Sequence, residues 1–371
     1  MKKIFLFFIF SFIFNQEECD NSRYLDEVFN VEVDYNVQYG QNINESFWGS
    51  QITENLYMDI YQPINDNFEF RPLIFFMFGG SFVGGSKSNS DIVALCNNYA
   101  KMGYVAVAID YRLSQHLLFF FPNEENAYKA VMKSIHDLKA AIRYFRMDDE
   151  FYNNYNIDIN RIFAGGISAG AIGSVNAAYL DDINEVPNFL NEDLNGIGGL
   201  EGLSGSSGYS SEFNGVVNLC GAVGSRDWII ENDIPIVSMH GNQDDTVPYD
   251  DSLVTLFGLN IQVDGSYIIH EKMLELDNYS QLYTYENQGH VPFSDMRFET
   301  DFSRDFLYDL VCYQDVLIGD LNQDFSINIS DVVILINLIL GNEYTSYGDL
   351  NYDDTLNVQD IILLVDIILD N

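Results

Sequence analysis

The stretch "RIFAGGISAGAIG", residues 161–173, decides how the whole chain is interpreted. An apolar segment ends in "AGG" and an alanine-rich segment follows, so the pattern predicts a β-strand that turns sharply into a helix. Ser168 lies at this corner, between Gly166 and Gly170. Glycines remove the clashes that side chains would make in so tight a turn. The serine is therefore either part of a plain turn or a nucleophile raised above the edge of a sheet.

Segments with strand and helix patterns alternate on both sides of this corner. Continuous apolar runs such as "PLIFFMF", "YVAVAIDY" and "IPIVSMHG" are typical of strands that are buried on both faces. Before them, residues 24–63 alternate polar and apolar side chains and predict antiparallel strands. We therefore expect an α/β fold with a mostly parallel, doubly wound sheet. Residues 181–214 are rich in Gly, Ser and Asn and predict a long irregular insertion.

The composition restricts the possible partners and the location. The chain has 371 residues, a formal net charge of −39 and a pI near 4.1. Nucleic acids and anionic membranes require a basic face, so we expect neither as a partner. The first residues, "MKKIFLFFIFSFIF", place two lysines before an apolar run that is too short to span a bilayer. They predict a signal peptide over residues 1–18 and a secreted or cell-surface location, as for an exported bacterial protein without integral membrane association.

The cysteines of an exported protein favour disulfides, and the four in this chain allow three pairings. Cys19 and Cys312 bracket the main domain, so a bridge between them would tie its ends together. That bridge would leave Cys96 to pair with Cys220. The sequence contains no CxxC pair, which argues against a thiolate zinc site.

A serine nucleophile needs a base and an acid that orients the base. His290 lies in the loop "ENQGHVPF", after an apolar strand pattern and before the last helix of the main domain. "IPIVSMHGNQDDTVPY" offers Asp244 just past another strand, with Asp245 as the fallback. Aspartates are also common in plain turns, so the spacing alone leaves that alternative open.

The loop "FGGSFVGG", residues 78–85, follows an apolar strand and is a candidate oxyanion hole. Its glycines let the backbone approach a reacting carbonyl group, and backbone N–H groups can then stabilise the oxyanion. The expected donors are Gly80, Ser81 and Ala169. Glycine-rich loops also bind phosphates, but no G-K-[ST] follows this one, so it is not a P-loop.

Over roughly residues 24–312 the sequence resembles the α/β-hydrolases of the carboxylesterase and lipase type. The motifs that carry the resemblance are "FGGSFVGG", "AIDYRLS", "GGISAGA", "HGNQDDTVPY" and "QGHVPF". The resemblance implies that Ser168, Asp244 and His290 form a catalytic triad in the family's chain order and need no cofactor. The sequence departs from the family's HGGG motif, since Phe78 replaces the histidine and Ser81 the third glycine. We therefore expect residues 19–313 to form the catalytic domain.

The expected substrate pocket is less specific. Phe82, Tyr209 and Trp228 are candidates for an apolar or aromatic pocket, although packing in the core is the more common role of such side chains. The segment after Tyr111 and the insertion at 181–214 are expected to line the entrance.

Residues 319–371 contain two copies of one pattern, "GDLNQDFSINISD" and "GDLNYDDTLNVQD", each followed by an apolar helix pattern. Oxygen ligands at positions 1, 3, 5, 7, 9 and 12 of such a loop suit Ca²⁺. The first set is Asp320, Asn322, Asp324, the Ser326 carbonyl, Asn328 and Asp331, and the second is Asp349, Asn351, Asp353, the Thr355 carbonyl, Asn357 and Asp360.

This tail resembles dockerin type I repeats, which implies a small all-α module over residues 314–371 with two structural calcium ions. The resemblance also implies docking to a cohesin-like scaffold protein. The alternative is a calcium-stabilised appendix without a partner. Its two apolar helices are expected to pack on each other or on that partner.

The sequence thus predicts a secreted serine esterase that hydrolyses carboxylic esters through an acyl-enzyme. Polysaccharide-linked acyl or feruloyl esters fit a docked enzyme, and simple acyl esters or lipids fit equally well. The alternatives are a serine peptidase on the same fold and a non-catalytic, calcium-dependent binding protein.

Overall fold

The computed structural model describes residues 19, 22–46, 48–114, 122–187, 198–255, 258–312, 319–321, 327–341, 344–345, 348–351 and 355–370. The predicted signal peptide lies outside these residues. The chain divides into two compact units, Met1–Tyr308 and Asp309–Asn371, so the division falls inside the helix α8, Arg297–Cys312. No helix in these described ranges is both long and apolar enough to cross a membrane.

The larger unit is built on an eight-stranded sheet with the order β1-β2-β4-β3-β5-β6-β8-β11. The strands are β1 Val31–Glu45, β2 Gln51–Pro63, β3 Arg71–Met77, β4 Val105–Ile109, β5 Ile157–Ile167, β6 Val216–Leu219, β8 Ile236–Gly241 and β11 Ser280–Tyr285. The pairs β1–β2 and β2–β4 are antiparallel. Every later pair in the sheet order, from β4–β3 to β8–β11, is parallel. The prediction of a mostly parallel sheet preceded by antiparallel strands is confirmed.

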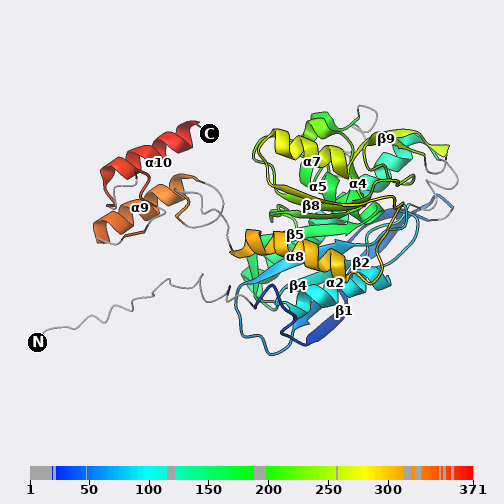
Figure 1. Ribbon diagram of the computed structural model, residues 1–371. Helices are drawn as coiled ribbons and strands as arrows, with labels where there is room; N and C mark the ends of the chain where they lie inside the picture. The colour runs from blue at the N-terminus through cyan, green and yellow to red at the C-terminus, as the bar shows by residue number, and fades with distance from the viewer. Residues whose placement is uncertain are drawn as a thin grey trace, which may run out of the picture. The chain divides into compact units, whose positions relative to one another are not determined.

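Helices cover both faces of this sheet (Figure 1). The helices are α2 Ser90–Lys101, α4 Glu124–Phe151, α5 Ala169–Tyr179, α7 Ser266–Glu275 and α8. The helices α4, α5 and α7 lie on one face and α2 and α8 on the other. A hydrogen bond of 2.6 Å between Tyr99 and Ser303 joins α2 to α8. Every residue of β3 and β4 is buried, which is why their sequences are continuously apolar.

A second, three-stranded sheet was not predicted. It has the order β7-β10-β9, with β7 Ala222–Val223, β9 Asp251–Val254 and β10 Ile261–Gly265. The hairpin of β9 and β10 lies between β8 and α7 in the chain, and β7 follows directly after β6. Short 3₁₀ turns are present at Ile183–Glu185 (η1) and Arg226–Trp228 (η2).

Residues 198–214 of the insertion contain no helix or strand and are held against α4. His136 donates to the carbonyl of Gly199 at 2.8 Å, and Arg143 pairs with Glu201 at 3.1 Å. Tyr209 donates to Glu150 at 2.8 Å near the end of the same helix. These contacts fix the segment along α4.

The smaller unit contains two helices, α9 Ile329–Gly341 and α10 Val358–Asp370. They pack on each other around Val332, Leu335 and Leu364, so the first of the two expected packings is observed. Leu321 and Leu350, which follow the first aspartate of each repeat, pack against this cluster. The repeated sequence therefore builds one small shared core.

Candidate active site

Ser168 occupies the sharp turn between β5 and α5 with a φ of 54° and a ψ of −118°. This left-handed conformation is strained for a residue with a Cβ, and such strain is typical of functional sites. A Cβ on Gly170 would lie 2.1 Å from the carbonyl oxygen of Met77, and one on Gly166 would lie 2.5 Å from Gly170. The two glycines are therefore required for the close packing that holds the serine in this conformation.

Three side chains from different elements form one hydrogen-bonded chain at the carboxyl edge of the sheet. The Ser168 hydroxyl donates to Nε2 of His290 at 2.8 Å, and Nδ1 of His290 donates to Oδ2 of Asp244 at 2.6 Å. The Asp244 side chain is fully buried, and the His290 side chain is 20% exposed. A base that is both oriented and partly open to solvent can accept the proton of the serine and pass it on.

Asp244 is held as a carboxylate by its neighbours. Burial by itself would raise its pKa, but hydrogen bonds from His240 and His290 outweigh burial and hold the pKa well below its usual range. The amides of Thr246 and Val247 donate to its second oxygen at 2.8 and 3.0 Å. The neighbouring Asp245 is exposed. The structure thus places Asp244, and not the fallback Asp245, against His290.

His240 is a second histidine on the same carboxylate, a role that the sequence pattern did not predict. Its Nε2 lies 3.1 Å from Oδ2 of Asp244 and 3.0 Å from the carbonyl oxygen of Val247. Both partners are acceptors, so Nε2 carries the proton, and the hydroxyl of Ser266 lies 2.8 Å from Nδ1. The side chain is completely buried at the end of β8. Its only sequence signal was a polar residue in an otherwise apolar strand.

The loop after β3 approaches the serine closely. A Cβ on Gly79 would lie 3.3 Å from the Cβ of Ser168. Gly80 has a φ of 132°, Ser81 one of 55°, and a Cβ on Gly80 would clash with the carbonyl oxygen of Gly84 at 2.2 Å. Ser81 and Ala169 line the same cavity as Ser168. Two of the predicted oxyanion donors, Ser81 and Ala169, thus lie around the nucleophile, and Gly80 directly precedes Ser81 in the same loop.

Phe78 orders this loop by stacking in place of the usual histidine. Its ring lies on Tyr111 with the centroids 4.3 Å apart and the planes 13° apart. The Tyr111 hydroxyl donates to the carbonyl of Phe78 at 2.8 Å, and a Cβ on Gly85 would lie 2.5 Å from the Phe78 ring. The departure from the family motif is therefore compensated by aromatic packing.

The disulfide bonding differs in part from the expected pairing. Cys19 and Cys312 are disulfide-bonded, whereas Cys96 and Cys220 are free and buried. The predicted Cys96–Cys220 bridge is wrong, because Cys96 lies on α2 and Cys220 follows β6, where its sulfur faces the triad.

Cys220 is part of the environment of the triad. Ligand atoms of Cys220, Asp244 and His290 lie within 4.8 Å of one another, the only such group of possible metal ligands among the described residues. Burial raises the pKa of the Cys220 thiol well above its usual value. A protonated thiol is a poor metal ligand, so the group is better explained as packing behind His290.

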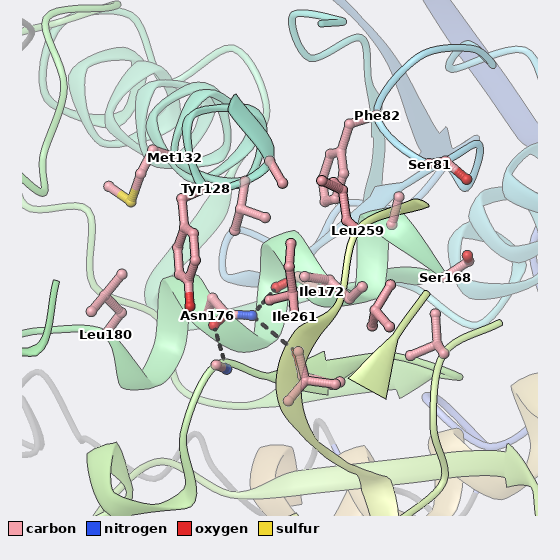
Figure 2. Close-up of a pocket in the computed structure, with 18 of the residues that line it drawn as sticks. Ser81, Phe82, Tyr128, Met132, Ser168, Ile172, Asn176, Leu180, Leu259 and Ile261 are labelled. Carbon is pink, nitrogen blue, oxygen red and sulfur yellow. Dashed lines mark hydrogen bonds between the residues drawn. The ribbon is translucent and has the colours of Figure 1, made fainter. Parts of the chain in front are cut away.

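A cavity of about 130 Å³ opens beside Ser168 (Figure 2). Its lining is almost entirely apolar and comes from α4, α5, η2 and the hairpin of β9 and β10. Phe82 and Trp228 line it, as expected. Tyr209 does not, because the insertion that carries it is tied to the end of α4 by the bond to Glu150. Most other lining residues were not predicted from the sequence, among them Tyr128, Met132, Leu180, Val254, Leu259, Ile261 and Val263.

The last aspartates of the two repeats, Asp331 and Asp360, make equivalent hydrogen bonds. Asp331 accepts from the amides of Leu321 and Asn328 at 2.8 and 2.9 Å. Asp360 accepts from the equivalent amides of Leu350 and Asn357 at 3.0 and 2.8 Å. Of the other predicted ligands, Asp320 and Asp349 are almost fully buried. The structure also describes Asn351 and Thr355. Four predicted ligands lie outside the described residues: Asn322, Asp324, Ser326 and Asp353.

Known proteins resemble the larger unit. A family model described as BD-FAE matches residues 58–223. An esterase 2 from Thermogutta terrifontis, phosphorylated by paraoxon, is 21% identical with a TM-score of 0.52, covering 78% of this chain and 97% of its own. The propionate-bound form is 22% identical with a TM-score of 0.53 and the same coverage. The larger unit has the α/β-hydrolase fold. No curated protein sequence matches this one.

Proposed function

We propose that this protein hydrolyses carboxylic esters through an acyl-enzyme on Ser168. The observation that carries the proposal is the hydrogen-bonded chain from Ser168 through His290 to the buried Asp244, at the mouth of an apolar cavity. A nucleophile, an oriented base and a substrate pocket meet at one point. The similarity to esterase structures supports the same choice at the level of the fold.

The reaction follows from the roles of these groups. The Ser168 oxygen attacks the ester carbonyl while Nε2 of His290 takes its proton, and Asp244 stabilises the resulting imidazolium. The amides of Gly80, Ser81 and Ala169 stabilise the oxyanion, each donor contributing about 3 kcal/mol to the transition state. The tetrahedral intermediate collapses, and His290 gives the proton to the leaving alcohol. Water, activated by His290, then releases the acid and restores the serine.

The kinetics of Ser168→Ala test this proposal. We expect kcat for p-nitrophenyl butyrate to fall by at least about 10⁴-fold while the protein stays folded. Peptide anilides are the control substrates, since a peptidase would cleave them as readily. Full activity in Ser168→Ala, or cleavage of anilides without cleavage of esters, would contradict the proposal.

We also propose that the smaller unit binds two calcium ions. Asp320, Asp331, Asp349 and Asp360 are almost fully buried, and they hold the first and last ligand positions of the two loops. Their hard oxygens, with those of the asparagines at loop positions 3 and 9, form a donor set that fits Ca²⁺. The bound ions would hold the loops against the shared core, and no step of the ester hydrolysis depends on them.

The outer faces of α9 and α10 support the proposal of a docking partner. Ile329, Val333 and Leu340 of α9 are 69%, 54% and 77% exposed. Val358, Ile362 and Leu369 hold the equivalent places in α10 and are 63%, 55% and 76% exposed. Two matching apolar stripes suit one protein partner, for which we propose a cohesin-like scaffold outside the cell.

Calorimetry of the full chain with a cohesin domain tests the docking proposal. We expect saturable binding that Val333→Asp combined with Ile362→Asp removes, whereas Asp366→Asn in α10 retains it. Equal binding by the doubly substituted protein would contradict the assigned surface.

A further inference from the structure

The cavity beside Ser168 follows α5. Figure 2 shows Ser168 at one end and Leu180 at the other, with Ile172 and Asn176 between them along α5. Ser168 directly precedes α5 and Leu180 directly follows it, so this helix positions both lining residues. The hairpin of β9 and β10 forms the opposite wall through Ile261 and its neighbours.

The volume of the cavity limits the size of the group it can hold. It measures about 130 Å³. A cavity of about 150 Å³ lined by apolar side chains holds one benzene molecule, so this slightly smaller cavity accepts about five or six carbon atoms. An acetyl group would leave most of it empty, and a hydroxycinnamoyl group has about twice as many heavy atoms as it can hold.

The lining also offers little to a polar acyl group. None of the described lining residues has a charged side chain. Asn176 is the most polar group at depth, but its amide nitrogen donates to the carbonyls of Ile172 and Ala222 at 2.7 and 3.0 Å. Its oxygen accepts from the amide of Gly224 at 2.9 Å. A phenol or carboxylate placed beside Asn176 would lose its water without gaining a hydrogen bond from that side chain.

Trp228 makes the wall beside Gly224 rigid. A Cβ on Gly224 would lie 2.3 Å from the indole ring, so the ring packs directly on the glycine backbone. The turn η2 that carries Trp228 is capped by Ser225, which accepts from the amide of Asp227 at 3.2 Å. The cavity is therefore preformed, and a bound chain loses little free energy in ordering it.

From these observations we infer that the acyl part of the substrate is an aliphatic chain of about six carbons, bound along α5. This inference rests on the proposed ester hydrolysis. The carboxyl carbon lies at Ser168, and the chain extends past Ile172 towards Leu180. Each methylene that enters the cavity should raise kcat/KM about fourfold, which corresponds to about 0.8 kcal/mol.

A series of p-nitrophenyl esters tests the inference, from acetate through butyrate, hexanoate and octanoate to dodecanoate, with methyl ferulate for comparison. We expect kcat/KM to rise about fourfold per methylene up to about six carbons and then to level off or fall. Methyl ferulate should react at least about tenfold more slowly than methyl octanoate.

Two substitutions locate the chain within the cavity. Ile172→Phe should fill its middle and lower kcat/KM for octanoate about fiftyfold, the effect of about three buried methylenes, while acetate changes by about twofold or less. Leu180→Ala should move the optimum to longer chains. Ile230→Phe is the matched control, because Ile230 is 54% exposed and is absent from the lining.

The outcomes separate the inference from the proposed function. Ser168-dependent hydrolysis that is flat with chain length, that prefers ferulate, or that is unaffected by Ile172→Phe overturns the acyl assignment and leaves an esterase. Hydrolysis of no ester at all overturns both.

Discussion

At the scale of single residues, Asp244 does the most to prepare the site for reaction. Two histidines and two amides converge on its carboxylate, so it stays ionised although its side chain is fully buried. The sequence could supply Asp244 and His290 because each follows a strand pattern at the expected place. It could not supply His240, whose contact with Asp244 arises only when the loop after β8 folds back.

His240 is therefore expected to act as a positioning residue. In His240→Phe the carboxylate loses one of its hydrogen bonds, so we expect kcat to fall about tenfold with KM nearly unchanged. His240→Gln, which can restore a donor, should recover part of kcat, whereas Asp244→Asn should lower it by about 10⁴-fold. Steady-state kinetics beside thermal melting make the comparison. A loss of stability with unchanged kcat would assign His240 a purely structural role.

The cysteines give a second test at the same scale. Burial raises the pKa of both Cys96 and Cys220 well above the usual value, so neither should react in the folded protein. Titration of the oxidised protein with a thiol reagent should find no reactive thiol when native and two after unfolding. Four should appear after reduction, since Cys19 and Cys312 are disulfide-bonded. No thiol in the unfolded, unreduced protein would restore the second bridge.

At the scale of elements, the sequence predicted the strands and helices that have strong periodicity, and it missed the parts that depend on tertiary contacts. The apolar runs of β3, β4 and β8 predicted the sheet, because continuous apolar runs of this length are typical of strands that are buried on both faces. The hairpin of β9 and β10 has short, half-exposed strands without such a signal. The acyl cavity was missed with it, since the hairpin supplies one wall.

The insertion was expected at the entrance of the site, and its described residues 198–214 lie on α4 instead. His136 explains part of this placement, because its ring donates to Gly199 and a Cβ on Gly202 would lie 2.6 Å from it. Burial lowers the pKa of His136 from 6.5 to about 4. Protonation of the unfolded chain between these values therefore favours unfolding.

Stability should thus fall as the pH drops from 6.5 to 4, by up to about 3 kcal/mol from His136 alone. The sign follows because the unfolded state binds the proton in this range and the folded state does not. Thermal melting of wild type and His136→Gln against pH measures the effect. The glutamine keeps a donor for Gly199 but does not titrate, so its profile should be flatter. Identical profiles would show that His136 does not control this segment.

At the scale of the whole molecule, the two units carry separate functions in our account. The repeat predicted the second unit because two copies of a twelve-residue ligand pattern rarely arise by chance. The described residues agree with the repeat, because Asp331 and Asp360 accept hydrogen bonds from backbone amides at equivalent positions of their loops.

Removal of calcium should affect only the smaller unit. We expect calorimetry of the full chain to detect two calcium ions, and Asp331→Ala or Asp360→Ala to remove one each. At one hundred times the dissociation constant, one ion should stabilise its unit by about 2.7 kcal/mol. A chelator should remove this stabilisation and leave hydrolysis of p-nitrophenyl butyrate unchanged. A chelator that abolishes hydrolysis would contradict the separation of the two functions.

The central claim is that Ser168 forms the acyl-enzyme, and mass spectrometry of the acid-quenched reaction tests it most directly. Full-length protein mixed with p-nitrophenyl butyrate should carry one butyryl group on the peptide that contains Ser168. The same peptide from Ser168→Ala should remain unmodified. A butyryl group on another residue, or rapid hydrolysis without any acylated peptide, would contradict the account.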